Sequence, residues 1–161
     1  MYKEYKEGIK VFLSYARKDA VLRDELVAHL TALKWRGVIQ DWNDEQIEAG
    51  TDWDKAIASH MDSADIILLL LSADFLASDY SWDEAQRALK RHESGQARVI
   101  PVLLRPVAHL SDTPFANLQF SPSGGKPITR WEDKDAAFLS VARDIRKAAG
   151  ELTALAAAND A

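Results

Sequence analysis

Hydrophobic residues gather into short runs that recur about every 30 residues, the length of one strand–helix–strand unit. The runs that we predict as strands are Ile9–Ser14, Val38–Trp42, Asp65–Leu71, Arg98–Leu104 and Lys126–Thr129. The first, third and fourth are nearly continuous in Val, Ile and Leu, which is typical of parallel strands covered on both faces. Pro101 in the fourth run argues against a regular strand there, because proline donates no hydrogen bond to a neighbouring strand.

Between these runs, apolar residues recur with the period of amphipathic helices. The predicted helical stripes are Leu22, Leu26, Leu30 and Leu33; Trp53, Ile57 and Met61; Ala85, Ala88 and Leu89; and Phe138, Val141, Ala142, Ile145 and Ala149. Asp19, Ser78 and Asp79 stand where helix N-caps are expected. Gly150 stands where the last helix is expected to end.

Alternating strands and helices predict an α/β fold with a parallel sheet and helices on both faces. Short right-handed crossovers favour a flavodoxin-like arrangement of five strands in the order 2-1-3-4-5. Segment 106–125 is rich in Pro, Ser and Gly, so we predict an irregular connection with one short helical turn. Residues 1–150 are predicted to form one domain. The Ala-rich tail 151–161 either extends the last helix or leads into a further domain.

Composition and charge exclude several classes of function. The 161 residues include no cysteine, which excludes disulfides and thiolate metal sites, and the four histidines are too scattered for a helical metal site. The net charge of −5 is spread along the chain, so nucleic acid is not an expected partner. The charged start of the chain and the shortness of its apolar runs predict neither a secretion signal nor a membrane span. We therefore expect a cytoplasmic protein.

The predicted strand order indicates where a ligand binds. In this order the direction of winding reverses between strands 1 and 3, and ligands bind beyond the carboxyl ends of the strands at such a point. The residues expected there are Ser14, Tyr15 and Arg17 after the first strand and the segment Ser72–Glu84 after the third. The loop Asn43–Thr51 is expected to flank them.

Tyr80 and Glu84 are the pair at this edge that suggests the most specific ligand chemistry. Four residues apart at the start of a helix, they share one face. An aromatic ring beside a carboxylate suits a flat cationic ring joined to a sugar: the ring stacks, and the carboxylate stabilises positive charge that develops on the sugar. Trp82 stands between them in the sequence.

The same residues have ordinary structural explanations. A glutamate in the first turn of a helix interacts favourably with the helix dipole and is usually solvated. Tyr80 can serve as a packing residue, Arg17 as surface charge, and Ser14 as the polar end of a strand. Trp42 and Trp53 are predicted to be core residues rather than part of a binding site. On the residues alone, both interpretations stay open.

Other catalytic patterns are missing from the sequence. There is neither a G-x-S-x-G nucleophile motif nor a GxxxxGK[ST] phosphate loop, and Gly124-Gly125 does not precede a predicted helix. A phospho-receiver domain shares the expected architecture. It needs acidic residues at the end of the first strand, where this chain has Ser14-Tyr15.

Taken together, several segments resemble the Toll/interleukin-1 receptor (TIR) domain of the bacterial type. The matching segments are 11–15 (VFLSY) with Asp19, 41–50 with Trp53, 63–72, 75–80 (FLASDY) with Glu84, and 98–103 (RVIPVL). The family carries a proline in its fourth strand, which accounts for Pro101. The resemblance covers roughly residues 9–149, and the order and spacing of the segments make it specific.

The family includes enzymes that cleave NAD+ at the nicotinamide–ribose bond, releasing ADP-ribose or cyclic isomers of it. These enzymes have a glutamate on the helix after strand 3 and an aromatic residue four positions before it. The resemblance therefore implies that Glu84 is catalytic and that NAD+ is the substrate, with no cofactor. The residues implied to contact NAD+ are Ser14, Tyr15, Arg17, Gly50, Trp53 and Tyr80. This chain has Tyr80 where those enzymes often have Trp, and Ser81 where the family often has Cys.

The loop Asn43–Thr51 resembles the family's BB loop, which contacts neighbouring TIR domains. The resemblance thus implies activation by self-association and a role in bacterial antiphage defence. Two alternatives stay open: a non-catalytic scaffold that acts by TIR–TIR assembly, and a nucleoside-processing glycosyl transferase that would turn over deoxynucleosides instead of NAD+. A further C-terminal domain is a possible partner in the same protein.

Overall fold

The computed structural model describes residues 8–42 and 48–160. Its centre is a parallel sheet of four strands in the order β2-β1-β3-β4. The strands are β1 (Ile9–Ser14), β2 (Ile39–Trp42), β3 (Ile66–Leu71) and β4 (Arg98–Leu103). The helices are α2 (Ala20–His29), α3 (Thr31–Trp35), α4 (Trp53–Ser63), α5 (Ala73–Ala77), α6 (Asp79–Glu93) and α7 (Lys134–Asp160).

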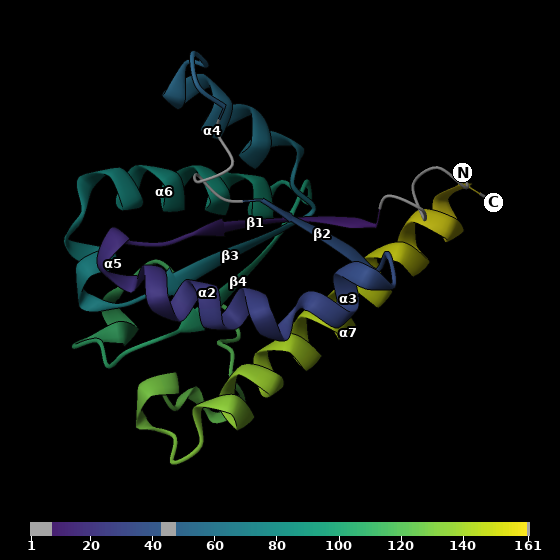
Figure 1. Cartoon of the computed structure of the whole chain (residues 1–161). Coiled ribbons are helices and arrows are strands. Elements are labelled where there is room, and N and C mark those ends of the chain that lie inside the picture. The colour runs from purple at the N-terminus through teal and green to yellow at the C-terminus, as the bar shows by residue number, and fades with distance from the viewer. Residues whose placement is uncertain (1–7, 43–47, 161) are drawn as a thin grey trace.

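The sheet separates two hydrophobic cores (Figure 1). Alternate residues of β3 face opposite sides, and all six are buried, as expected for a strand covered on both faces. Ile66, Leu68 and Leu70 pack with α2, α3 and α7, whereas Ile67, Leu69 and Leu71 pack with α4, α5 and α6. The doubly covered parallel sheet predicted from the apolar runs is confirmed.

The four predicted strands that form the sheet agree with the structure to within one residue. Pro101 lies in β4 and pairs with Leu69 of β3. The other edge of Pro101 meets an irregular segment, where its carbonyl accepts a hydrogen bond from the Ser121 N–H at 3.0 Å. A proline is tolerated there because no regular strand on that side requires the N–H that it lacks.

The predicted fifth strand, Lys126–Thr129, is wrong. Within the described residues this region forms two 3₁₀ turns, η4 (Ser123–Gly125) and η5 (Ile128–Arg130). Two proline residues, Pro122 and Pro127, remove donors that a ladder requires, and Gly124 and Gly125 adopt positive φ values. The segment still lies along the edge of β4, where the Thr129 N–H donates to the Leu104 carbonyl at 3.1 Å.

The predicted helix end at Gly150 is also wrong, since α7 continues to Asp160. The residues after Gly150 are mostly Ala and Leu, whose high helix propensity outweighs one glycine. Glu151 forms an ion pair with Arg98 at 2.9 Å, and the Thr153 hydroxyl donates to the Ala149 carbonyl at 2.8 Å. Residues 151–160 therefore extend the last helix.

The apolar stripe predicted from Leu22 to Leu33 lies on one face but belongs to two helices. Leu26, Leu30 and Leu33 are buried against the sheet. The helix breaks at Leu30, which separates α2 from α3. The segment 106–125 is irregular as predicted, but it contains two short helical turns rather than one, η3 (Leu110–Asp112) and η4 (Ser123–Gly125).

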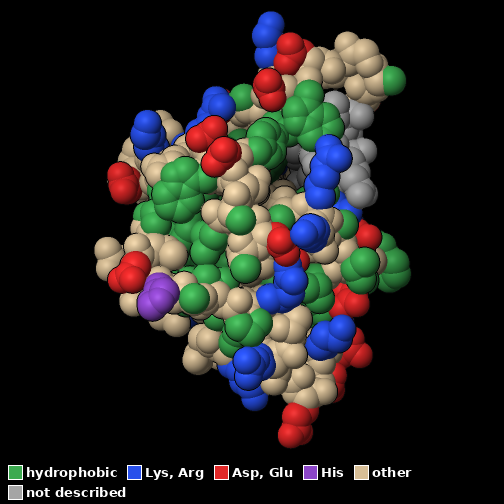
Figure 2. All heavy atoms as spheres, turned by 90° about the vertical axis from the view of Figure 1, so that its left-hand side faces the viewer, with side chains coloured by type: hydrophobic (Ala, Val, Ile, Leu, Met, Phe, Trp, Pro, Cys, Tyr) green, Lys and Arg blue, Asp and Glu red, His purple; other side chains and the backbone are tan. Residues whose placement is uncertain are grey.

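This architecture brings the ends of β1, β3 and β4 to one edge, which faces the viewer in Figure 2. Ser14 ends β1, Ser72 follows β3, and Arg105 follows β4 by two residues. Basic, acidic and hydrophobic side chains lie close together on this face. The carboxyl edge is therefore the place in the fold where polar groups from separate segments meet.

Candidate functional site

A cleft of about 490 Å³ opens at the carboxyl edge of the sheet, within the usual range for small-molecule sites. Its walls come from the turn after β1, the start of α4, the short helix α5 and the first turn of α6. The side chains most relevant to ligand chemistry there are Tyr15, Arg17, Lys18, Trp53, Asp74 and Tyr80. The location agrees with the strand-reversal point predicted from the sequence.

Four of the predicted ligand-binding residues line this cleft: Tyr15, Arg17, Trp53 and Tyr80. Tyr80 is 43% exposed and Trp53 is 39% exposed, so both aromatic side chains are partly open to solvent at the cleft. The prediction that Trp53 is a core residue is wrong, because it is the first residue of α4 and lies at the rim of the site. The side chain of Trp42 lies outside the described residues.

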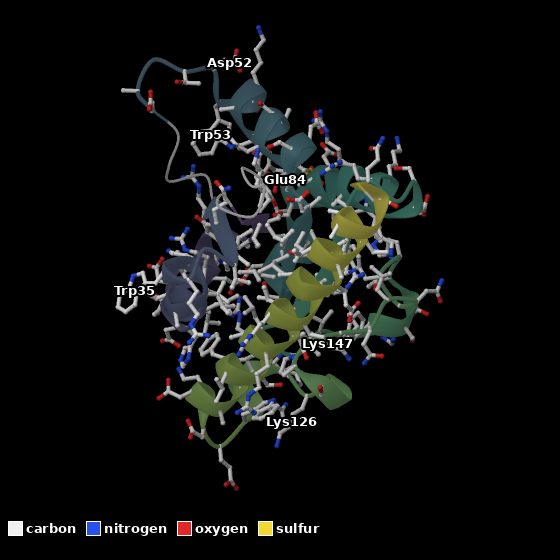
Figure 3. All side chains as sticks on the ribbon, turned by 90° about the vertical axis from the view of Figure 1, so that its right-hand side faces the viewer. Trp35, Asp52, Trp53, Glu84, Lys126 and Lys147 are labelled. Atoms are coloured by element: carbon white, nitrogen blue, oxygen red, sulfur yellow. The ribbon has the colours of Figure 1, made fainter. Side chains whose placement is uncertain are left out.

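Glu84 and Ser14 lie together, and neither is among the residues that line the cleft. The Ser14 hydroxyl donates to the Glu84 Oε1 at 2.5 Å. Ser14 is 2% exposed, while Glu84 is partly exposed. Figure 3 labels Glu84 among other side chains near α4 and α6, whereas Trp35 projects into solvent. The structure thus joins two predicted site residues that are 70 positions apart in the sequence.

The start of α6 explains how Tyr80 and Glu84 reach the site. Ser78 is the N-cap, as predicted, and its side chain accepts a hydrogen bond from the Ser81 N–H at 3.3 Å. Tyr80 and Ser81 then fall in the first turn and line the cleft. Glu84 follows one turn later and is directed toward the end of β1.

Tyr15 is held by a buried arginine that the sequence analysis did not single out. Arg23 of α2 is 1% exposed, and its guanidinium donates to the Tyr15 hydroxyl at 2.5 Å. The guanidinium carbon also lies 4.4 Å from the centre of the Tyr15 ring, in a cation–π contact. Arg23 in turn pairs with Asp24 at 2.7 Å. The buried guanidinium of Arg23 therefore holds the Tyr15 ring in place at the cleft.

Asp19 does not cap α2 as predicted; no cap hydrogen bond forms from its side chain. Its carboxylate is 1% exposed and accepts a hydrogen bond from the Ser72 hydroxyl at 2.5 Å. Arg105 Nη2 lies 2.8 Å from Asp19 Oδ1 as an ion pair. The buried position of Asp19 explains this change of role, because a carboxylate removed from water needs a cation and hydrogen-bond donors.

Arg105 also pairs with Asp74 of α5, which faces the cleft. The hydrogen bond from Arg105 is the main reason that the pKa of the Asp74 carboxyl lies below its ordinary value. The same hydrogen bond raises the pKa of Arg105. Lys18 approaches Asp74 at 3.6 Å with its own side chain 80% exposed. The network ties the ends of β1, β3 and β4 to α5.

Gly50 adopts a φ of 84°, which confirms that it takes a backbone shape that other residues resist. It is exposed and does not line the cleft. Most of the loop Asn43–Thr51, including its acidic residues Asp44 and Glu45, lies outside the described residues. Asp52 directly follows the loop. Its side chain caps α4 by accepting a hydrogen bond from the Lys55 N–H at 3.0 Å.

Comparison with known proteins decides the family. The sequence model described as "TIR domain" matches residues 11–148. The chain belongs to the TIR domain family. The TIR domain thus covers both the sheet and the cleft, and α7 continues beyond the matched region.

One relative of this TIR domain is the uncharacterized protein y4lF of Sinorhizobium fredii (strain NBRC 101917 / NGR234). The two are 52% identical over 149 residues, which is 92% of this chain and 46% of the relative. The chain therefore spans about half the length of that protein.

Two solved structures share the fold. The TIR domains of the activated Roq1 resistosome, which directly recognises the pathogen effector XopQ, are 25% identical with a TM-score of 0.50 over 59% of this chain and 57% of theirs. The TIR domain of the Toll-related receptor TRR-2 from Hydra magnipapillata is 20% identical with a TM-score of 0.56. That match covers 84% of this chain and 97% of the receptor domain.

The site residues that sequence analysis did not identify are Asp74, Lys18, Arg23 and Arg105. A signal for Arg105 was available, because it closely follows the fourth predicted strand and therefore belongs to the same edge as Ser14. Asp74 lay within the segment Ser72–Glu84 but carried no local signature. Arg23 could not be separated from ordinary surface arginines, because its burial depends on the packing of α2.

Within residues 8–42 and 48–160, no group of three or more His, Cys, Asp or Glu side chains could hold a metal ion. The helices in this part of the TIR domain are also too short or too polar to cross a membrane. The cleft itself is lined by aromatic rings, hydroxyls, the Asp74 carboxylate and the cations Arg17 and Lys18, and Arg105 pairs with Asp74.

Proposed function

We propose that this TIR domain is an NAD+ nucleosidase, a hydrolase or cyclase that cleaves the nicotinamide–ribose bond. The observation that carries this proposal is the position of Glu84, one helical turn after the exposed Tyr80 of the cleft and hydrogen-bonded to Ser14 at the end of β1. A module that only assembles has no need of a carboxylate held in this place.

The proposed reaction fits a single carboxylate. Glycosidases ordinarily require a second carboxyl group, which protonates the leaving oxygen. Nicotinamide departs from NAD+ as a neutral molecule because its ring nitrogen carries the positive charge beforehand. The enzyme then needs only to hold the ribose and stabilise the positive charge that develops on it, which is the proposed role of Glu84.

The cleft supplies groups suited to the rest of NAD+. Tyr80 lines the cleft and is 43% exposed, and its proposed role is to stack with nicotinamide. Cation–π attraction adds to that contact while the nicotinamide ring is charged. Arg17 and Lys18, from the turn after β1, also line the cleft and offer positive charge to the two phosphates. Asp74 partly neutralises Lys18, so Arg17 is the main candidate for the phosphate contact.

Self-association is part of the proposal. The relevant similarity is to the TIR domains in the activated Roq1 resistosome. Glu48 is exposed, and so is Asp52, which directly precedes Trp53 of the cleft. Assembly through the loop Asn43–Thr51 would complete the site and switch on cleavage. The biological role that fits such an enzyme is antiphage defence in bacteria, where loss of NAD+ or a cyclic product acts as the signal.

One observation favours the alternative, a TIR scaffold without catalysis. Neither Ser14 nor Glu84 lines the open cleft, and Glu84 Oε1 already accepts a hydrogen bond from Ser14. A scaffold would bind other TIR domains and leave NAD+ intact. A nucleoside-processing transferase would instead turn over deoxynucleosides.

The test is an incubation with NAD+ over a wide range of protein concentrations, with and without a crowding agent, with products resolved by chromatography. We expect nicotinamide release per molecule to rise steeply with concentration and to vanish in Glu84→Ala. A second product peak distinguishes ADP-ribose from a cyclic isomer. Assemblies visible by light scattering without any nicotinamide release would support the scaffold instead, and cleavage of deoxynucleosides the transferase.

A further inference from the structure

Ser14 is enclosed at the end of a central strand. It pairs with Leu69 in the parallel ladder between β1 and β3, and its side chain is 2% exposed. The cleft is lined by the residues that follow it, from Tyr15 to Lys18, and not by Ser14 itself. Because the Ser14 side chain is 2% exposed, its hydroxyl is enclosed by the protein, whereas Glu84 is partly exposed.

The helix that carries the partner of this hydroxyl is packed against β1. Glu84 is carried by α6, and its Oε1 lies 2.5 Å from the Ser14 Oγ. Phe12 of β1 packs in the same buried cluster as Ala85 and Ala88 of α6. The two small alanines allow the helix to approach the strand closely, so both ends of the hydrogen bond stand on rigid elements.

A glutamate on a helix has several accessible rotamers, which differ in where they place the carboxylate. A short hydrogen bond from a buried hydroxyl to a carboxylate is strong and favours one of them. We propose, on the basis of the proposed function, that Ser14 is a positioning residue that holds Glu84 in the orientation that stabilises charge on the ribose. Ser14 acts through Glu84 and does not contact NAD+, in contrast to the ligand contact expected from the family resemblance.

The experiment measures NAD+ cleavage by three variants. Ser14→Ala removes only the hydroxyl oxygen, and Ser14→Thr retains a hydroxyl. The matched control is Ser121→Ala: Ser121 is also 2% exposed and donates to a carboxylate, that of Asp144 at 2.6 Å, beside β4 and away from the cleft lining. Each variant is assayed at a protein concentration that gives the same degree of assembly as the wild type.

We expect Ser14→Ala to lower kcat by about 10- to 100-fold, because misplacement of a catalytic group by about 1 Å costs rates of this order. KM should stay within about twofold, since uniform binding of the substrate is unchanged. Ser14→Thr should recover most of the lost rate, and Ser121→Ala should match the wild type in both constants.

Three kinetic results would overturn the inference. A raised KM with unchanged kcat in Ser14→Ala would mean that Ser14 contacts NAD+ directly. Wild-type constants in Ser14→Ala, or an equal loss of kcat in Ser121→Ala, would also contradict it. A double-mutant cycle of Ser14→Ala and Glu84→Ala, followed by denaturant unfolding, tests the hydrogen bond without activity. No coupling in that cycle also overturns the inference. A wild-type protein that cleaves no NAD+ refutes the proposed function, while the cycle still tests the contact.

Discussion

The ends of β1 and β3 carry the same local arrangement with different consequences. Ser14 is the last residue of β1, and Ser72 directly follows β3. Both serines are buried and donate to a carboxylate at 2.5 Å, Ser14 to Glu84 and Ser72 to Asp19. Asp19 is 1% exposed and forms an ion pair with Arg105. Glu84 is partly exposed beside the cleft. The carboxylate of Asp19 is thus enclosed in the fold, whereas that of Glu84 is partly open to solvent.

The two serines also differ in the other contacts that they make, and these contacts relate each carboxylate to a different part of the fold. Ser72 also accepts a hydrogen bond from the Phe75 N–H and so begins α5. It therefore couples Asp19 to the backbone of a helix. Ser14 lies within the ladder between β1 and β3, and its hydroxyl donates to the side chain of Glu84 on α6. We expect changes at the first pair to affect stability and changes at the second to affect activity.

The largest expected effect on stability follows Asp19→Ala. This change leaves the Ser72 hydroxyl and the Arg105 guanidinium without their buried acceptor. Removing one partner of a buried charged pair costs about 2–4 kcal/mol, discounted here because Arg105 is partly exposed. Denaturant unfolding measures the loss. A change below 0.5 kcal/mol would mean that this network contributes little to the fold, on the scale of ordinary surface substitutions.

The next largest effect is expected on activity, from Tyr80→Ala. Loss of the stacking surface should lower kcat/KM by about tenfold, which corresponds to a loss of roughly 1.4 kcal/mol of interaction free energy. Tyr80→Trp should retain or raise kcat/KM because the larger ring also stacks. Equal activity in all three proteins would exclude Tyr80 from substrate binding.

A smaller effect is expected from Arg17→Ala, which removes positive charge from the cleft wall. KM for NAD+ should rise about three- to tenfold with kcat nearly unchanged, as expected for uniform ground-state binding of a phosphate. The control is Lys147→Ala, an exposed lysine of α7 labelled in Figure 3 that is not part of the cleft. A similar rise of KM in the control would show a general charge effect instead.

The smallest effect concerns Asp74, whose pKa is lowered chiefly by the hydrogen bond from Arg105. A lowered pKa in the folded state stabilises the protein at pH values above the ordinary carboxyl value of 3.8. This contribution is lost as the pH falls below 3.8 through the folded-state pKa. Thermal melting from pH 7 to 2 should therefore show Asp74→Asn less stable than the wild type at neutral pH, with the difference shrinking below 3.8. A constant difference would contradict this account.

Much of the fold could be predicted from local patterns. Continuous apolar runs located β1, β3 and β4 because a doubly covered strand leaves a plain local signal. The strand order then located the cleft, and with it Tyr15, Arg17 and Tyr80. These predictions needed only short-range periodicity and the topology rules of parallel sheets.

What could not be predicted depends on contacts between distant segments. Asp19 looked like a helix cap, and only the fold brings Arg105 to it. Lys126–Thr129 carried the right spacing for a strand, but the prolines around it prevent a ladder. Trp53 looked apolar enough for the core, whereas the start of α4 places it at the rim of the cleft.

The most direct test of the account replaces each carboxylate by its amide, Glu84→Gln and Asp19→Asn, and measures both NAD+ cleavage and unfolding. Glu84→Gln should lose about 100- to 1,000-fold in kcat, typical of one lost electrostatic contact to the transition state, and keep the wild-type melting temperature. Asp19→Asn should melt earlier and retain kcat per folded molecule. Full turnover by Glu84→Gln would contradict the central claim that this carboxylate stabilises the charge on the ribose.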